Sequence, residues 1–125
     1  MFLIDTHTLL WYLKDSPELS KKSTEIINTE PTIFVSIVSL WEIAIKKSIG
    51  KLQINKSISE IEDLCIKKEI SILPIKSKHL DYLELLEKIH NDTFDRLLIC
   101  QAKTEDLCII TKDSIIPSYS VNTIW

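Results

Sequence analysis

The chain has 125 residues, of which 45% are hydrophobic and 26% are charged, and its formal net charge is −3. These values are typical of one globular domain, covering residues 1–125, and they exclude a disordered tail, a collagen-like repeat and the basic footprint of a strong nucleic-acid binder. The sequence contains no apolar run of the ~18 residues that span a bilayer, and its start lacks the basic segment of a signal peptide. We therefore expect a cytoplasmic protein.

Short apolar runs alternate with helical patterns along the chain, which predicts an α/β fold with a mainly parallel sheet. The first helix is expected to follow Asp5 and the second to include residues 26–27. The third is capped by Ser36 or Ser39 and stopped by Gly50. Strands are predicted at residues 2–4, 33–35, 70–73, 107–111 and 121–124.

The second half of the chain shows three further helical patterns, each with an expected capping residue. Ser57 precedes the first of them, Ser77 precedes a helix that continues to Glu87, and Asp92 precedes the last. We expect His79, on the middle helix of the three, to be exposed. The three cysteines, Cys65, Cys100 and Cys108, form no metal-binding spacing, and we expect reduced thiols without a disulfide or zinc site.

Four carboxylates fall where this predicted fold places functional groups. Asp5 and Asp113 follow the C-terminal ends of two strands, where ligands bind in open α/β sheets. Glu42 lies on the helix after the second strand, and Asp95 lies in the first turn of the helix before the fourth. Because oxygen ligands of this kind suit Mg²⁺, the residues alone indicate a metal-dependent phosphoryl-transfer or phosphodiesterase site.

Each of these acids also has a purely structural interpretation. Asp5 can cap the first helix, Asp113 can belong to an ordinary turn, and Asp95 is a first-turn acid favoured by the helix dipole. Glu42 lies at the edge of an apolar arc and can pair with Lys46 four residues later. Grouped carboxylates repel one another, so a positive group is expected among them, and neutral amide replacements are expected to keep or raise stability without metal.

Four stretches of the sequence together resemble the PIN-domain ribonucleases, and specifically VapC-type toxins of type II toxin–antitoxin systems. The resemblance covers nearly the whole chain in the right order, and it departs from the family at Thr93, often Pro, and at Cys100, often Ala. The matching stretches are LIDTHTLLW at residues 3–11, SIVSLWEIAIKKSIGKL at 36–52, HNDTFDRLLICQA at 90–102 and ITKD at 110–113.

This resemblance implies a PIN-like three-layer fold with a central sheet of about four or five strands flanked by helices. It implies a metal-dependent endoribonuclease that hydrolyses RNA with a metal-activated water, a cognate antitoxin protein as partner, and a homodimer. It also implies that Mg²⁺ or Mn²⁺ is held by a set of four acids, Asp5, Glu42, Asp95 and Asp113.

Several neighbouring residues are candidates for supporting roles. Thr6 and Thr111 can place hydroxyls beside the metal site, and Asp92 is expected chiefly to cap its helix. Arg96 can either bind phosphate or form an ion pair with Asp95. Two histidines, His7 and His90, flank the site. Either can contact substrate or orient a carboxylate, but structural or surface roles are favoured for both.

Two alternative functions remain open. The first is a catalytically silent PIN-fold module that binds RNA or protein, and the presence of all four acids counts against it. The second is a phosphoacceptor receiver-type signalling domain. That class needs two adjacent acids after the first strand and an Asp after the third, and this sequence has neither.

Overall fold

Five short apolar segments pair into a fully parallel sheet with the strand order β3-β2-β1-β4-β5. The computed structural model describes all of residues 1–125, and it confirms the predicted α/β class. The strand order differs from the 2-1-3-4-5 order of receiver domains, which argues against that alternative. The strands are β1 (Phe2–Ile4), β2 (Ile33–Ser36), β3 (Ile70–Leu73), β4 (Cys108–Ile110) and β5 (Thr123–Ile124).

Six α-helices and one 3₁₀ helix connect these strands. Most begin at a side chain that accepts a hydrogen bond from the first turn, as predicted for Ser36, Ser57 and Asp92. Ser57 forms a complete capping box with Glu60: the Ser57 hydroxyl accepts the Glu60 N–H at 3.1 Å, and the Glu60 carboxylate accepts the Ser57 N–H at 2.9 Å. The helices are α1 (Thr6–Leu13), α2 (Lys21–Thr29), α3 (Ile37–Ser48), α4 (Ile58–Lys67), α5 (Ser77–Leu85), α6 (Thr93–Glu105) and η1 (Ile116–Tyr119).

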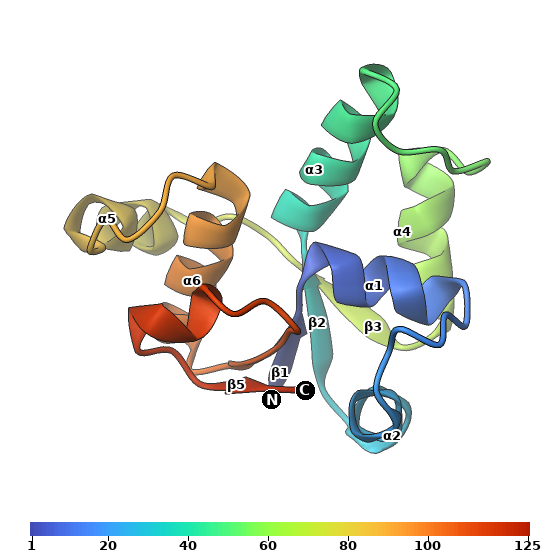
Figure 1. Cartoon of the computed structure of the whole chain (residues 1–125), viewed down its shortest axis with the longest axis horizontal. Helices are drawn as coiled ribbons and strands as arrows, with labels where there is room; N and C mark the ends of the chain where they lie inside the picture. The colour runs from blue at the N-terminus through green and yellow to red at the C-terminus, as the bar shows by residue number, and fades with distance from the viewer.

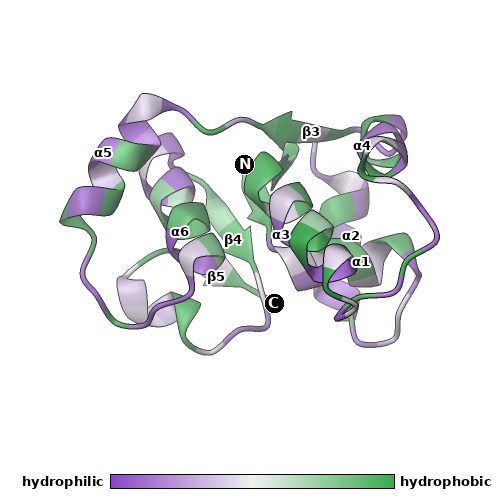
Figure 2. Ribbon diagram, turned by 90° about the horizontal axis from the view of Figure 1, so that it is seen from above, coloured by the Kyte–Doolittle hydropathy of each residue, from purple (hydrophilic) through white to green (hydrophobic).

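The helices form two layers that enclose the sheet. Helices α1 to α4 lie on one face, and α6, with α5 packed against it, lies on the other (Figures 1 and 2). Successive strand residues point to opposite faces, so Leu3 and Ile109 contact the α6 layer while Ile4 and Ile110 belong to the cluster formed with α1 to α4. This arrangement confirms the three-layer architecture.

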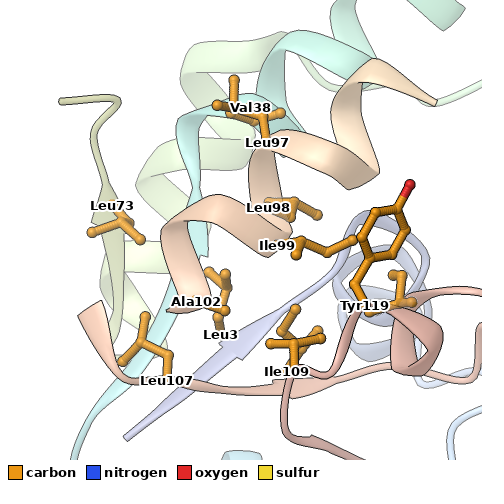
Figure 3. Close-up of a cluster of buried hydrophobic side chains, with 12 residues drawn as sticks. Leu3, Val38, Leu73, Leu97, Leu98, Ile99, Ala102, Leu107, Ile109 and Tyr119 are labelled. Atoms are coloured by element: carbon orange, nitrogen blue, oxygen red, sulfur yellow. The ribbon is translucent and has the colours of Figure 1, made fainter. Parts of the chain in front are cut away.

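The core on the α6 side contains one aromatic residue, Tyr119, among aliphatic side chains (Figure 3). Its ring lies beside Ile99, while its hydroxyl oxygen points away from the cluster. Tyr119 is only 3% exposed. A buried aromatic ring with a polar tip needs a hydrogen-bond partner, and the partners of this hydroxyl belong to the candidate site described below.

Helix α5 differs from the prediction in two respects. It begins after Lys76 rather than after a Ser77 cap, and it ends at Leu85 rather than Glu87. His79 is fully buried, not exposed, because α5 packs on α6 and this position faces inward. Its Nδ1 accepts the Lys76 N–H at 2.9 Å, in place of a hydroxyl cap, and its Nε2 lies 2.8 Å from Glu105 Oε2 on α6.

The three cysteines are free, as predicted. Cys65 and Cys100 are buried, and burial raises the pKa of each thiol to about 11. Cys108 is half-buried. None of the helices combines the length and the apolar character that crossing a bilayer requires.

Candidate active site

Asp5 lies where the order of the sheet reverses. The chain runs outward from β1 through β2 to β3 and then returns to β4 on the other side of β1. Asp5 follows β1 and caps α1, because its Oδ1 accepts the Thr8 N–H at 2.9 Å. Its Oδ2 accepts a short hydrogen bond of 2.5 Å from the hydroxyl of Thr111, the residue after β4. Asp5 therefore caps a helix as considered above, and it does so at the edge of the sheet where ligands bind in open α/β folds.

Glu42 reaches the same region from α3 and is also buried. Its Oε1 accepts a hydrogen bond of 2.7 Å from the hydroxyl of Thr6, the neighbour of Asp5 in sequence. Its Oε2 pairs with Lys46 Nζ at 2.6 Å. Lys46 is thus the positive partner that the sequence indicated, and Ser39 Oγ, 3.0 Å from the Thr6 hydroxyl, completes the group.

Asp95 lies in the first turn of α6 and is less well compensated. The Asp92 carboxylate caps this helix by accepting the Asp95 N–H at 2.9 Å, as predicted. The only side chain that contacts the Asp95 carboxylate is His90, whose Nε2 lies 3.3 Å from Oδ2. Burial, together with the negative charges of Asp92 and Asp113, raises the pKa of Asp95 to about 6.

Asp113 is exposed and shapes the turn after β4. Its Oδ1 accepts the N–H groups of Ile115 and Ile116 at 2.6 and 3.0 Å, which starts η1. Its own N–H donates to the Thr111 hydroxyl at 3.0 Å, so Thr111 joins Asp5 and Asp113. Asp113 therefore has the turn role considered for it, and its second carboxylate oxygen forms no hydrogen bond.

Tyr119 is a member of the site that the sequence did not single out. Its hydroxyl lies 2.6 Å from His90 Nδ1, accepts the His90 N–H at 2.9 Å and accepts from Arg96 Nη1 at 3.2 Å. Burial raises the pKa of Tyr119, but the hydrogen bonds with His90 outweigh it and the net shift is downward. No local pattern marks this role, because 29 residues separate Tyr119 from His90.

His90 therefore joins Tyr119 to Asp95 through its two ring nitrogens. Burial lowers the pKa of His90, but the hydrogen bonds to Tyr119 and Asp95 give a net rise. When the ring is neutral, an Nδ1 that accepts from the tyrosine leaves the proton on Nε2, facing the carboxylate. His90 thus orients Asp95, one of the two roles considered for it.

Arg96 does not form the ion pair with Asp95 that was considered for it. Its Nη1 donates to the carbonyl oxygen of Glu87 at 3.0 Å as well as to Tyr119, and Nη2 reaches the carbonyl of Leu86 at 3.5 Å. It forms no ion pair with Asp95, because its guanidinium is directed to the segment between α5 and α6. Arg96 instead supports the site through Tyr119.

These contacts bring all four predicted acids to one region. Thr111 joins Asp5 to Asp113, Thr6 places Glu42 next to Asp5, and the charge of Asp113 acts on Asp95. As the side chains stand, no three His, Cys, Asp or Glu residues are close enough together to hold a metal ion. The donor set nevertheless fits a hard cation, because its members are carboxylates and only Glu42 is paired with a lysine. The four-acid metal set remains a prediction.

Comparison with known proteins relates the chain to one family. The PIN domain family model matches residues 2–121. Among solved structures, VapBC2 from Rickettsia felis bound to a promoter DNA fragment is similar with a TM-score of 0.74 and 15% identity, over 98% of this chain and 96% of that chain. Comparison with curated protein sequences finds no significant match.

Two further structures show the same fold. FitAcB from Neisseria gonorrhoeae has a TM-score of 0.67 and 14% identity, over 100% of this chain and 97% of that chain. A toxin–antitoxin complex from Klebsiella pneumoniae has a TM-score of 0.68 and 16% identity, again over 100% and 97%. At these identities the likeness concerns the fold.

Proposed function

The chain belongs to the PIN domain family, and from that premise we propose that it is a metal-dependent endoribonuclease, the toxin of a toxin–antitoxin pair. The observation that supports the proposal is that Thr111 links Asp5 to Asp113, Thr6 links Glu42 to the start of α1 beside Asp5, and the charge of Asp113 acts on Asp95. Helix caps alone do not account for it. Glu42 does not cap a helix. Asp95 lies where burial and neighbouring negative charge raise its pKa, so its position is unfavourable for a carboxylate that serves only the helix.

We assign the binding of Mg²⁺ or Mn²⁺ to these four acids. A divalent ion bound by these residues would supply Lewis-acid chemistry for phosphodiester hydrolysis. The chain's own contribution is to hold the oxygen ligands in place. Thr111 fixes Asp5, while Thr6 and Lys46 fix Glu42.

The α6 side of the site is positioned by a chain of hydrogen bonds. Asp92 holds the backbone at Asp95, and the Arg96–Tyr119–His90 series sets the orientation of the Asp95 carboxylate. A carboxylate whose orientation is fixed in advance needs no reorganisation when it binds a cation, which favours catalysis.

An antitoxin partner is supported by the structural neighbours, of which one is a toxin–antitoxin complex. A homodimer is supported by the apolar face that α3 leaves open, where Trp41, Ile45 and Ile49 are 46%, 37% and 59% exposed. Light scattering at micromolar concentration should give the mass of a dimer, and a strict monomer would contradict this part of the proposal.

The decisive experiment is cleavage of a panel of single-stranded RNAs by the purified protein with and without EDTA. We expect EDTA to abolish cleavage and added Mg²⁺ or Mn²⁺ to restore it. The four acids are hard oxygen ligands, and no member of this set can replace the cation. A preparation of Asp95→Asn made in the same way controls for contaminating nuclease. Cleavage that persists in EDTA, or equally in the variant, would overturn the proposal.

A further inference from the structure

Two hollows flank a single exposed side chain, His7, beside the candidate site. One has a volume of about 360 Å³ and includes Lys46 and Lys51 in its lining. The other, of about 410 Å³, includes Asp5 and Asp113. We propose that His7 is a stacking platform for a nucleobase of single-stranded RNA and that Lys51 binds a phosphate of the same strand. This inference rests on the proposed function, whose substrate class it uses.

The position of His7 separates it from its neighbours on α1. Thr6 and Thr8 are buried and hydrogen-bonded, whereas His7 is exposed, two residues from Asp5. Its ring stacks on Trp11 with centroids 5.7 Å apart and an interplanar angle of 22°. Trp11 covers one face of the imidazole, and the exposure of His7 leaves the other open to a ligand.

The stack beneath His7 is itself held in place. Trp11 contacts Trp125 edge-on with centroids 5.7 Å apart, and Lys112 Nζ lies 5.9 Å from the centre of the Trp11 ring. A base that adds to such a stack gains contact area without ordering a flexible side chain. Single-stranded RNA is recognised mainly through unstacked bases that pack on aromatic rings, histidine included.

The lysines around the hollows differ in how they are paired. Lys46 is bound to Glu42, and Lys112 is bound to Glu18 at 3.2 Å. Lys51 is exposed and has no carboxylate partner, so it is the cation free to bind a phosphate. It lines the hollow that does not include Asp5 and Asp113, whose charges would repel a phosphate.

The test compares two probes, a 12-nucleotide single-stranded RNA and the same backbone without bases, by fluorescence anisotropy in EDTA at low salt. We expect His7→Ala to weaken binding of the RNA by ~10-fold, the usual effect of one lost stacking contact, and to leave the abasic probe unaffected. His7→Phe, which keeps an aromatic face, should restore binding. Lys51→Ala should weaken both probes and reduce the salt dependence by ~0.7 in slope.

Lys22→Ala is the matched control, since this exposed lysine lies on α2 and lines neither hollow. It should leave the affinity for both probes unchanged. Equal binding by wild type and His7→Ala, equal weakening by His7→Ala and His7→Phe, or failure of the wild type to bind RNA would each overturn the inference. If this surface binds a protein partner instead of RNA, wild type and His7→Ala should bind the RNA equally.

A cleavage assay in Mg²⁺ separates this inference from the proposed function. We expect His7→Ala to raise KM more than it lowers kcat, because the stacked base lies apart from the carboxylates that act on the phosphodiester. If wild type binds RNA through His7 but does not cleave it, the nuclease proposal fails and the stacking site stands. If wild type cleaves and His7→Ala keeps the same KM, the stacking site fails and the nuclease stands.

Discussion

Asp5 and Glu42, the buried half of the site, are each 7% exposed, and every one of their carboxylate oxygens receives a hydrogen bond from the chain itself. Asp95 and Asp113, the open half, are more exposed, and the chain compensates their charge poorly. Asp95 has one histidine contact, and Asp113 uses a single oxygen to cap a turn.

The difference shows where the folded chain tolerates uncompensated charge. A carboxylate deep in the fold must be paired and hydrogen-bonded, since desolvation without compensation is costly. At the rim, partial burial of Asp95 and its repulsion by Asp92 and Asp113 are tolerated, and together they raise the pKa of Asp95. A bound cation would relieve that repulsion, so the open half is the part of the site whose stability and chemistry should respond most to metal.

The largest effect should separate Asp95 from the acid that caps its helix. We expect Asp95→Asn to reduce the cleavage rate at least ~10²-fold, the loss typical of one transition-state-stabilising group, while Asp92→Asn stays near the wild-type rate. Asn is about as good an N-cap as Asp, so Asp92→Asn should also fold normally. Initial rates in Mg²⁺ measure both. If Asp92→Asn is folded and as inactive as Asp95→Asn, Asp92 belongs to the metal set.

Removal of a carboxylate should have opposite effects on stability in the two halves. Asp5→Ala leaves the Thr8 N–H and the Thr111 hydroxyl without their partner, and we expect a loss of ~3 kcal/mol in the free energy of unfolding. Relief of charge repulsion, considered alone, predicts that neutral replacements keep or raise stability. This prediction applies to Asp95→Ala, because the Asp95 carboxylate has only one hydrogen-bond partner to lose. The stability of this variant in EDTA should hold or rise. Urea titrations of both variants test this contrast.

The pH dependence of stability offers a test of the open half alone. The pKa of Asp95 is raised to about 6 in the folded protein, whereas in the unfolded chain this carboxyl has its ordinary pKa of 3.8. Between these values the folded state binds more protons, so stability falls as pH rises. We expect this carboxyl to contribute a fall of ~2 kcal/mol in EDTA between pH 4 and 7.

Asp95→Asn serves as the control for that measurement, because it removes the titrating group and keeps the size of the side chain. Its stability should fall less than that of the wild type over the same range. Parallel curves for the two proteins would show that burial and neighbouring charge do not act on Asp95 as inferred.

The smallest effect should come from the hydrogen-bond chain behind Asp95. Tyr119→Phe keeps the buried ring but removes the hydroxyl that contacts His90 and Arg96, and we expect a loss of ~1 kcal/mol in stability. The ring ¹⁵N signals of His90 should also show a changed proton distribution between Nδ1 and Nε2. An unchanged NMR signature would mean that Tyr119 does not set the orientation of this ring.

Local signals in the sequence were sufficient for most of the fold. Apolar runs located all five strands, and the capping side chains Ser36, Ser57 and Asp92 located the starts of three helices, because these features depend on a few adjacent residues. The wrong prediction at His79 has the opposite cause. Its burial results from α5 packing on α6, a contact between segments that no local pattern reports.

The same distinction divides the candidate site. The placement of Asp5 after a strand and of Asp95 in the first turn of a helix could be predicted, because strand ends and helix starts are visible in the sequence. The Glu42–Lys46 pair could be predicted because it follows helical spacing. The link from Tyr119 through His90 to Asp95 was missed, and Arg96 was given the wrong partner. Both depend on how η1 and the segment before α6 meet in three dimensions.

The central position of β1 has a consequence for the timing of synthesis. During synthesis Asp5 leaves the ribosome 106 residues before Thr111, the donor to its Oδ2. β1 likewise emerges well before β4, its partner on one side. Domains fold as units once their sequence has emerged, so a nascent chain has no finished carboxyl edge. The proposed nuclease would therefore complete its carboxyl edge only after Thr111 has emerged from the ribosome.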